Sequence, residues 1–129
     1  MRYAYILFIA AIVTSCSKHK DDFYPTIPVA TVTLSEPVES SVFHPGDTIT
    51  IKASAVSKTI IHGCDILIKK VNDTTVYFTK HIHDHNDTII INHKWKNILA
   101  APAQLEAQLT FHLDHDGNTA VKKVRFLSR

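Results

Sequence analysis

Cysteine is scarce in this chain of 129 residues, which has only Cys16 and Cys64. Two cysteines cannot make the disulfide framework of a stapled small domain, so the fold must depend on a hydrophobic core. A domain of about 100 residues can bury enough surface to form one. Basic and acidic residues are nearly balanced, at 14 and 12. Because no basic stripe is present, we expect no nucleic-acid partner.

The chain also lacks the motifs of common enzyme classes. It has no Gly-x-Ser-x-Gly nucleophile elbow, no phosphate-binding loop and no dinucleotide fingerprint. Cys64 lies among apolar neighbours in a predicted strand, which favours an inert core thiol over a nucleophile. We therefore predict that the protein is not an enzyme and has no catalytic residues.

No apolar run is long enough to span a bilayer. Residues 4–13 are apolar, whereas a spanning helix needs about 20 such residues. The run follows the positively charged Arg2 and precedes small residues, which is the arrangement of a secretory signal. We expect residues 1–15 to be a signal peptide.

Cys16 directly follows Val13-Thr14-Ser15, and this sequence resembles a bacterial lipobox. The resemblance implies that Cys16 carries a diacylglyceryl group and an amide-linked acyl chain. Each buried CH₂ contributes about 0.8 kcal/mol, so several chains anchor a protein firmly. Ordinary signal cleavage after Ser15, without a lipid, is the alternative.

Residues 16–27 are expected to form the lipid anchor and a flexible tether, because residues 17–22 contain no apolar side chain. Within this segment, Lys20-Asp21-Asp22 resembles the surface-export signal of Bacteroidetes-type lipoproteins. A solvated linker would explain the same charges. We expect lipid anchoring in the outer membrane, with the domain facing the periplasm or the cell surface.

Residues 28–129 show the period-two alternation of β-strands. The clearest run is residues 48–55, in which isoleucine and alanine face one side and polar residues face the other. Asp116-Gly117 is a strong hairpin signal. Strands are predicted at residues 30–34, 48–55, 64–71, 75–83, 88–95, 105–113 and 119–127. About seven short strands without a helix predict an all-β fold, an immunoglobulin-like antiparallel β-sandwich.

The alternation also predicts which side chains are buried. Cys64 and Trp95 are expected in the core, Phe43 is expected to plug it, and His93 is expected to point inward. Glu106, which alternates with the apolar residues of its strand, is expected to lie outside.

The order of these motifs resembles a group of Bacteroidetes lipoproteins of unknown function that have one immunoglobulin-like domain. The resemblance rests on Pro45-Gly46-Asp47-Thr48-Ile49-Thr50-Ile51, on His81-Ile82-His83 and on Leu113-Asp114-His115-Asp116-Gly117-Asn118. It implies a cadherin-like or fibronectin-like sandwich in the cell envelope. The group has no established activity to transfer.

Histidine is abundant, with nine residues. His81, His83 and His85 recur at a spacing of two, which places His81 and His83 on one face of a strand, about 7 Å apart. Imidazole suits zinc and copper, so these three residues are candidate metal ligands, with His112 or His115 as a candidate fourth. The alternative is a polar edge strand that happens to use histidine.

Asp114, Asp116 and Asn118 have the oxygen spacing that begins a calcium-binding loop. The later ligand positions do not follow the pattern, because Arg125 stands where glutamate is required. The Asp-Gly hairpin turn explains the same residues, so we favour a turn over calcium binding.

Together these features predict a lipid-anchored module of the cell envelope that binds or adheres without catalysis. Its expected partners are the membrane, through the lipid at Cys16, and a protein or glycan. We expect a monomer without a cofactor. The alternative function is transition-metal binding, to zinc or copper, through the histidines.

Overall fold

The structure is a computed structural model that describes residues 26–129. The signal peptide, Cys16 and most of the tether lie outside the described residues, so those expectations stay predictions. Within the described part of the chain, no helix is long and apolar enough to cross a membrane.

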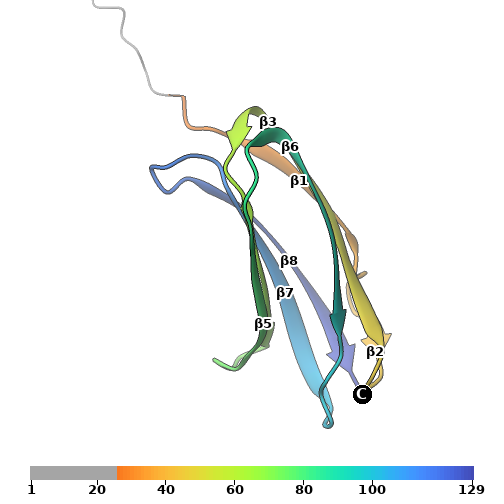
Figure 1. The fold of residues 1–129 in the computed structure, drawn as a ribbon. Helices are drawn as coiled ribbons and strands as arrows, with labels where there is room; N and C mark the ends of the chain where they lie inside the picture. The colour runs from red at the N-terminus through yellow and green to blue at the C-terminus, as the bar shows by residue number, and fades with distance from the viewer. Residues whose placement is uncertain (1–25) are drawn as a thin grey trace, which may run out of the picture.

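The described residues form two packed β-sheets (Figure 1). The eight strands are β1 (Ala30–Glu36), β2 (Val42–Phe43), β3 (Thr48–Ile61), β4 (Cys64–Lys70), β5 (Val76–Ile82), β6 (Asn86–Lys96), β7 (Ala103–His112) and β8 (Thr119–Ser128). One sheet has the order β1-β3-β6 and the other has the order β2-β8-β7-β4-β5. This arrangement matches the A-B-E and A′-G-F-C-C′ sheets of an immunoglobulin-like sandwich. The predicted fold class is confirmed.

The strands differ from the prediction in number and in one pairing direction. The structure has eight strands because residues 42–43, which lie outside the predicted strands, pair in parallel with Leu127 and Ser128 of β8. All the other strand pairs are antiparallel. The short β2 therefore covers the edge of β8, which would otherwise expose unpaired backbone groups.

One side chain at the start of β5 faces the opposite side from the one that the sequence alternation predicts. Val76 alternates in the sequence with Phe78 and Ile82, a pattern that predicts an inward side chain, but Val76 is 51% exposed. Ile68 pairs with Phe78, whereas Lys69 pairs with Val76, so Tyr77 is an extra residue on β5. Because side chains alternate along a strand, this bulge turns Val76 outward.

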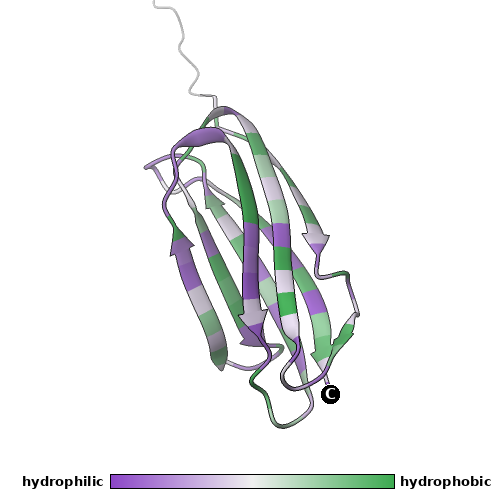
Figure 2. Cartoon of the chain, turned by 45° about the vertical axis from the view of Figure 1, so that its right-hand side comes forward, coloured by the Kyte–Doolittle hydropathy of each residue, from purple (hydrophilic) through white to green (hydrophobic). Residues whose placement is uncertain are grey.

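The core lies between the two sheets, and hydrophobic and hydrophilic residues alternate along the strands (Figure 2). Cys64 and Trp95 are buried as predicted, and the Phe43 ring packs edge-on against Phe126 with the ring centroids 5.7 Å apart. Burial raises the pKa of the Cys64 thiol to about 12, so this cysteine stays protonated and inert. His93 points inward, as predicted, and stacks on Phe78.

Three connections meet at the end of the sandwich where the described chain begins: residues 62–63, residues 83–85 and residues 113–118 (Figure 1). The C-terminus and the loop before β3 lie at the opposite end. We call the first end the histidine end, because it carries His62, His81, His83, His85, His112 and His115.

Candidate metal site

Three strands bring one carboxylate between two imidazoles at the histidine end. Asp65 is on β4, which lies between β5 and β7, and it pairs directly with His81 of β5. Its Oδ1 is 2.6 Å from Nδ1 of His81, and its Oδ2 is 2.7 Å from Nε2 of His112 at the end of β7. One ligand atom from each of the three residues lies within 4.8 Å of the others.

The charge on Asp65 suits this arrangement. Partial burial acts to raise the pKa of its carboxyl group, but hydrogen bonds from His81 and His112 outweigh burial and bring the pKa below its usual value. Asp65 is therefore an acceptor at neutral pH, so the facing nitrogens of both imidazoles carry the protons. A metal ion could replace those two protons, because its ligands must be deprotonated.

The group is accessible from solvent. The side chains of Asp65, His81 and His112 are 44%, 56% and 35% exposed. They lie on the outer face of the five-stranded sheet, which is opposite to the core. An ion could reach them without any rearrangement of the fold.

The predicted ligands His81, His83 and His85 are neighbours but do not point to one atom position. Nε2 of His83 is 3.1 Å from Nε2 of His85, whereas the ring centroids of His81 and His83 are 6.3 Å apart. His81 instead faces Asp65 and His112. His112 was predicted from the sequence as a candidate fourth ligand, whereas Asp65 was not predicted as a ligand. The antiparallel register of the β4–β5 hairpin would have placed Asp65 beside His81.

The remaining histidines of this end form a second group. Nδ1 of His62 is 3.1 Å from Nδ1 of His85, and the His62 and His115 ring centroids are 4.2 Å apart. Removal from water, followed by the nearby His115 and His85, lowers the pKa of His62. His62 is therefore neutral at pH 7, which is the form that binds a metal ion.

Gly63 determines how closely these strands approach. Its φ is +133°, and a Cβ there would lie 2.6 Å from the backbone oxygen of Ile82. The His112 amide donates to the Gly63 carbonyl at 3.0 Å, and the His62 amide donates to the His112 carbonyl at 2.7 Å. Only glycine fits this close approach without a shift of β5, so Gly63 positions both groups of histidines.

The candidate calcium ligands Asp114, Asp116 and Asn118 lie in the β7–β8 hairpin. Oδ1 of Asp114 accepts the backbone amides of Asp116 and Asn118, at 2.9 Å and 3.0 Å, and its Oδ2 accepts the Asn118 side chain at 2.6 Å. The Asn118 side chain contributes most to lowering the pKa of Asp114. Both oxygens of Asp114 are thus used by the turn, which favours the hairpin interpretation.

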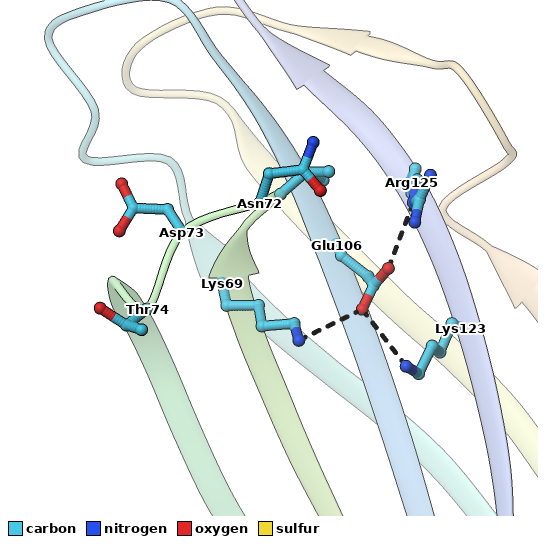
Figure 3. Close-up of a pocket in the computed structure, with 8 residues that line it drawn as sticks. Lys69, Asn72, Asp73, Thr74, Glu106, Lys123 and Arg125 are labelled. Carbon is cyan, nitrogen blue, oxygen red and sulfur yellow. Dashed lines mark hydrogen bonds and ion pairs between the residues drawn. The ribbon is translucent and has the colours of Figure 1, made fainter.

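A second charged cluster lies farther along the outer face of the same sheet (Figure 3). Glu106 lies on the outer face of β7, as predicted, but it is only 5% exposed, which the alternation does not predict. Lys69 and Lys123 each lie within 3.7 Å of its Oε1, and Arg125 Nε is 3.2 Å from its Oε2. These long side chains come from the two flanking strands and cover the carboxylate. The depression that they line has a volume of about 420 Å³.

No protein-family model matches the sequence, and no curated protein is similar enough to count as a relative. Among solved structures, the chain resembles the fibronectin(III)-like modules of CbhA from Clostridium thermocellum, at 20% identity and a TM-score of 0.48, with 76% of this chain and 94% of that chain covered. It also resembles the CARDB domain of PF1109 from Pyrococcus furiosus, determined with di-metal ions, at 11% identity and a TM-score of 0.44, with 78% and 90% covered. Murine CRIg is similar at 14% identity and a TM-score of 0.44, with 77% of this chain and 97% of that chain covered. At such distances the likeness concerns the fold, and the candidate site must be judged on its own residues.

Proposed function

We propose that this domain is a binding module whose ligand is a divalent transition-metal ion. The observation that carries the proposal is the Asp65 carboxylate held between the His81 and His112 imidazoles by three adjacent strands. Strands position side chains more rigidly than loops, which is what a metal site requires. The proposal gives the expected non-catalytic binding module a specific ligand.

The donor set identifies the class of ion. One carboxylate with two imidazoles is a set that zinc and copper accept, whereas calcium and magnesium prefer oxygen alone. Ligands about 2.0–2.1 Å from zinc in a tetrahedron lie about 3.3 Å apart. The present separations of 2.6 Å and 2.7 Å run to different oxygens of Asp65 and would each widen by about 0.6–0.7 Å. The three ligand atoms, which now lie within 4.8 Å of one another, would draw together around the ion.

Three protein ligands leave one position of a tetrahedral ion open. Because the group is solvent-exposed, water or a donor from another molecule would fill this position. A carboxylate, histidine or sugar hydroxyl of a partner could bind there. The expected contact with a protein or glycan would then run through the ion.

Isothermal titration calorimetry with zinc chloride or copper chloride tests the proposal. The full-length protein, purified in detergent with a histidine-free tag, should bind with micromolar or tighter affinity. A variant with Asp65→Asn, His81→Gln and His112→Gln should lose affinity at this site at least tenfold, so that it binds one ion fewer than the wild type.

His44→Gln is the matched control, because His44 lies near the C-terminal Arg129 at the opposite end of the sandwich. It should bind as the wild type does. Absence of heat with the wild type, or a triple variant that binds as many ions as the wild type with the same affinities, would overturn the proposal.

We further propose that the module is anchored by lipid at Cys16 in the outer membrane, as in the Bacteroidetes-type lipoproteins that it resembles. Support comes from the lipobox-like Val13-Thr14-Ser15-Cys16 and the charged segment after it. Mass spectrometry of the native N-terminal peptide should show an acylated Cys16 without residues 1–15. An intact Met1, or an unmodified thiol at position 16, would contradict anchoring.

A further inference from the structure

We propose that the histidine end binds a second transition-metal ion, through His62 and His85 with His115 as the third ligand. This inference rests on the proposed function, because it extends the same kind of ligand to a separate set of residues. None of these three residues belongs to the Asp65–His81–His112 group. The domain would then hold two ions side by side at one end of the sandwich.

The facing nitrogens of His62 and His85 carry the argument. Their Nδ1 atoms are 3.1 Å apart. Two nitrogens about 2.0–2.1 Å from one tetrahedral zinc ion lie about 3.3 Å apart, so this spacing already suits a shared ion. Two neutral imidazoles can face each other in this way only if one of the two nitrogens carries a proton. An ion would replace that single proton.

The backbone holds both rings from separate connections. The His62 amide donates to the carbonyl of His112 at 2.7 Å, which fixes the β3–β4 connection to β7. The His85 amide donates to Oδ1 of Asp84 at 2.7 Å, and this carboxylate also accepts the Asn86 side chain. The backbone positions that carry the two rings are thus fixed by hydrogen bonds that do not involve the ring nitrogens.

His115 comes from a third connection, the β7–β8 hairpin. Its ring centroid is 4.2 Å from that of His62, so rotation of the imidazole can bring a nitrogen towards the ion. The Asp114 turn fixes the backbone of this hairpin. Three loops from three parts of the sequence therefore each supply one imidazole.

The two sites use different atoms and can fill independently. The His85 ring has Nδ1 towards His62 and Nε2 on its other side, 3.1 Å from Nε2 of His83. The His83 ring centroid lies 6.3 Å from that of His81, which faces Asp65. We therefore expect two ions per chain, with His83 lying between them.

Native mass spectrometry and calorimetry with zinc chloride test this inference on the full-length protein. The wild type should bind two zinc ions. His62→Gln combined with His85→Gln should bind one, and His115→Gln alone should weaken the second ion at least tenfold. The variant with Asp65→Asn, His81→Gln and His112→Gln should also bind one ion, at the second site.

The outcomes separate this inference from the proposed function. If the wild type binds one ion and the His62→Gln, His85→Gln variant still binds it fully, the second site is overturned and the first is kept. If that variant binds no zinc while circular dichroism shows an intact sandwich, the inference that the two sites fill independently would also be overturned. Two ions in the His44→Gln control would support the assignment to the histidine end.

Discussion

Gly63 is the residue on which the histidine end depends most directly. Replacement by alanine would put a Cβ 2.6 Å from the Ile82 carbonyl, at a φ of +133° that side chains rarely adopt. We expect Gly63→Ala to lower the free energy of unfolding by about 1–3 kcal/mol. It should also weaken metal binding, because His62 and His81 flank the displaced backbone.

Urea denaturation with an unchanged m-value measures the stability effect. Gly117→Ala is the matched control, since Gly117 also has a positive φ, of +91°, but open space where a Cβ would lie. The control should lose less stability and bind metal as the wild type does. Equal losses in the two variants would show that the close approach at Gly63 has no energetic role.

His93 makes stability depend on pH in a defined direction. Burial, followed by the charge of Lys80, lowers the pKa of His93, whose ring stacks on Phe78 with centroids 5.0 Å apart. As pH falls below about 6.5, His93 becomes protonated in the unfolded chain but stays neutral in the folded chain. His93 therefore lowers the free energy of unfolding as the pH falls from about 6.5 towards the pKa of His93 in the folded protein.

We expect His93→Gln to abolish that contribution. Between pH 7.5 and pH 5.5, the free energy of unfolding of the wild type should fall more steeply than that of His93→Gln, by at most about 1.4 kcal/mol per pH unit. Urea titrations at several pH values measure how steeply the free energy of unfolding changes with pH. His44→Gln is the control, because it removes a histidine other than His93. Parallel slopes for wild type and His93→Gln would refute this account.

At the scale of elements, β4 organises the outer face of the five-stranded sheet. It carries Asp65 towards one end and Lys69 towards the other, and it lies between β5 and β7. Each of its outward positions therefore meets a neighbour on both sides. This explains why both charged clusters of the sheet contain a β4 residue.

The cluster around Glu106 should contribute to stability above acid pH. Burial acts to raise the pKa of Glu106, but the hydrogen bond from Arg125 and the charges of Lys123 and Lys69 outweigh it, so the folded pKa is lowered. A lowered carboxyl pKa stabilises above the unfolded value of about 4.3, and that stability is lost as pH falls through the folded pKa.

Glu106→Gln keeps the shape of the side chain and removes its charge. We expect it to lower the free energy of unfolding by about 1–3 kcal/mol at pH 7, with the difference shrinking below pH 4. Glu36→Gln is the control, because the Glu36–Lys52 pair is exposed and should contribute less than about 1 kcal/mol. Equal effects of the two substitutions in urea denaturation would argue against a special role for Glu106.

At the scale of the whole molecule, the two charged clusters are independent parts of one face. Asp65 and Lys69 are four positions apart on β4, which is about 13 Å along a strand. Effects of substitutions farther apart than about 10 Å usually add. We expect Asp65→Asn and Glu106→Gln to be additive in stability to within about 0.5 kcal/mol, and Glu106→Gln to leave zinc affinity unchanged. A double-mutant cycle checks the first expectation, and calorimetry checks the second.

The sequence alone determined seven of the eight strands and the fold class. Alternation along residues such as Ile49 and Ile51 is a local pattern, because successive side chains of a strand face opposite sides whatever the rest of the chain does. Where a bulge broke the pattern, at Tyr77, the prediction failed. A bulge depends on the partner strand, so it leaves no signal in its own segment.

Only the tertiary structure decided which polar residues meet. The spacing of the histidines indicated metal chemistry, but Asp65 and His112 joined His81 because β4 is placed between β5 and β7. Glu106 became buried for the same kind of reason, since the side chains that cover it come from neighbouring strands. Contacts across a sheet depend on strand order and register, which long-range packing sets and local sequence does not encode.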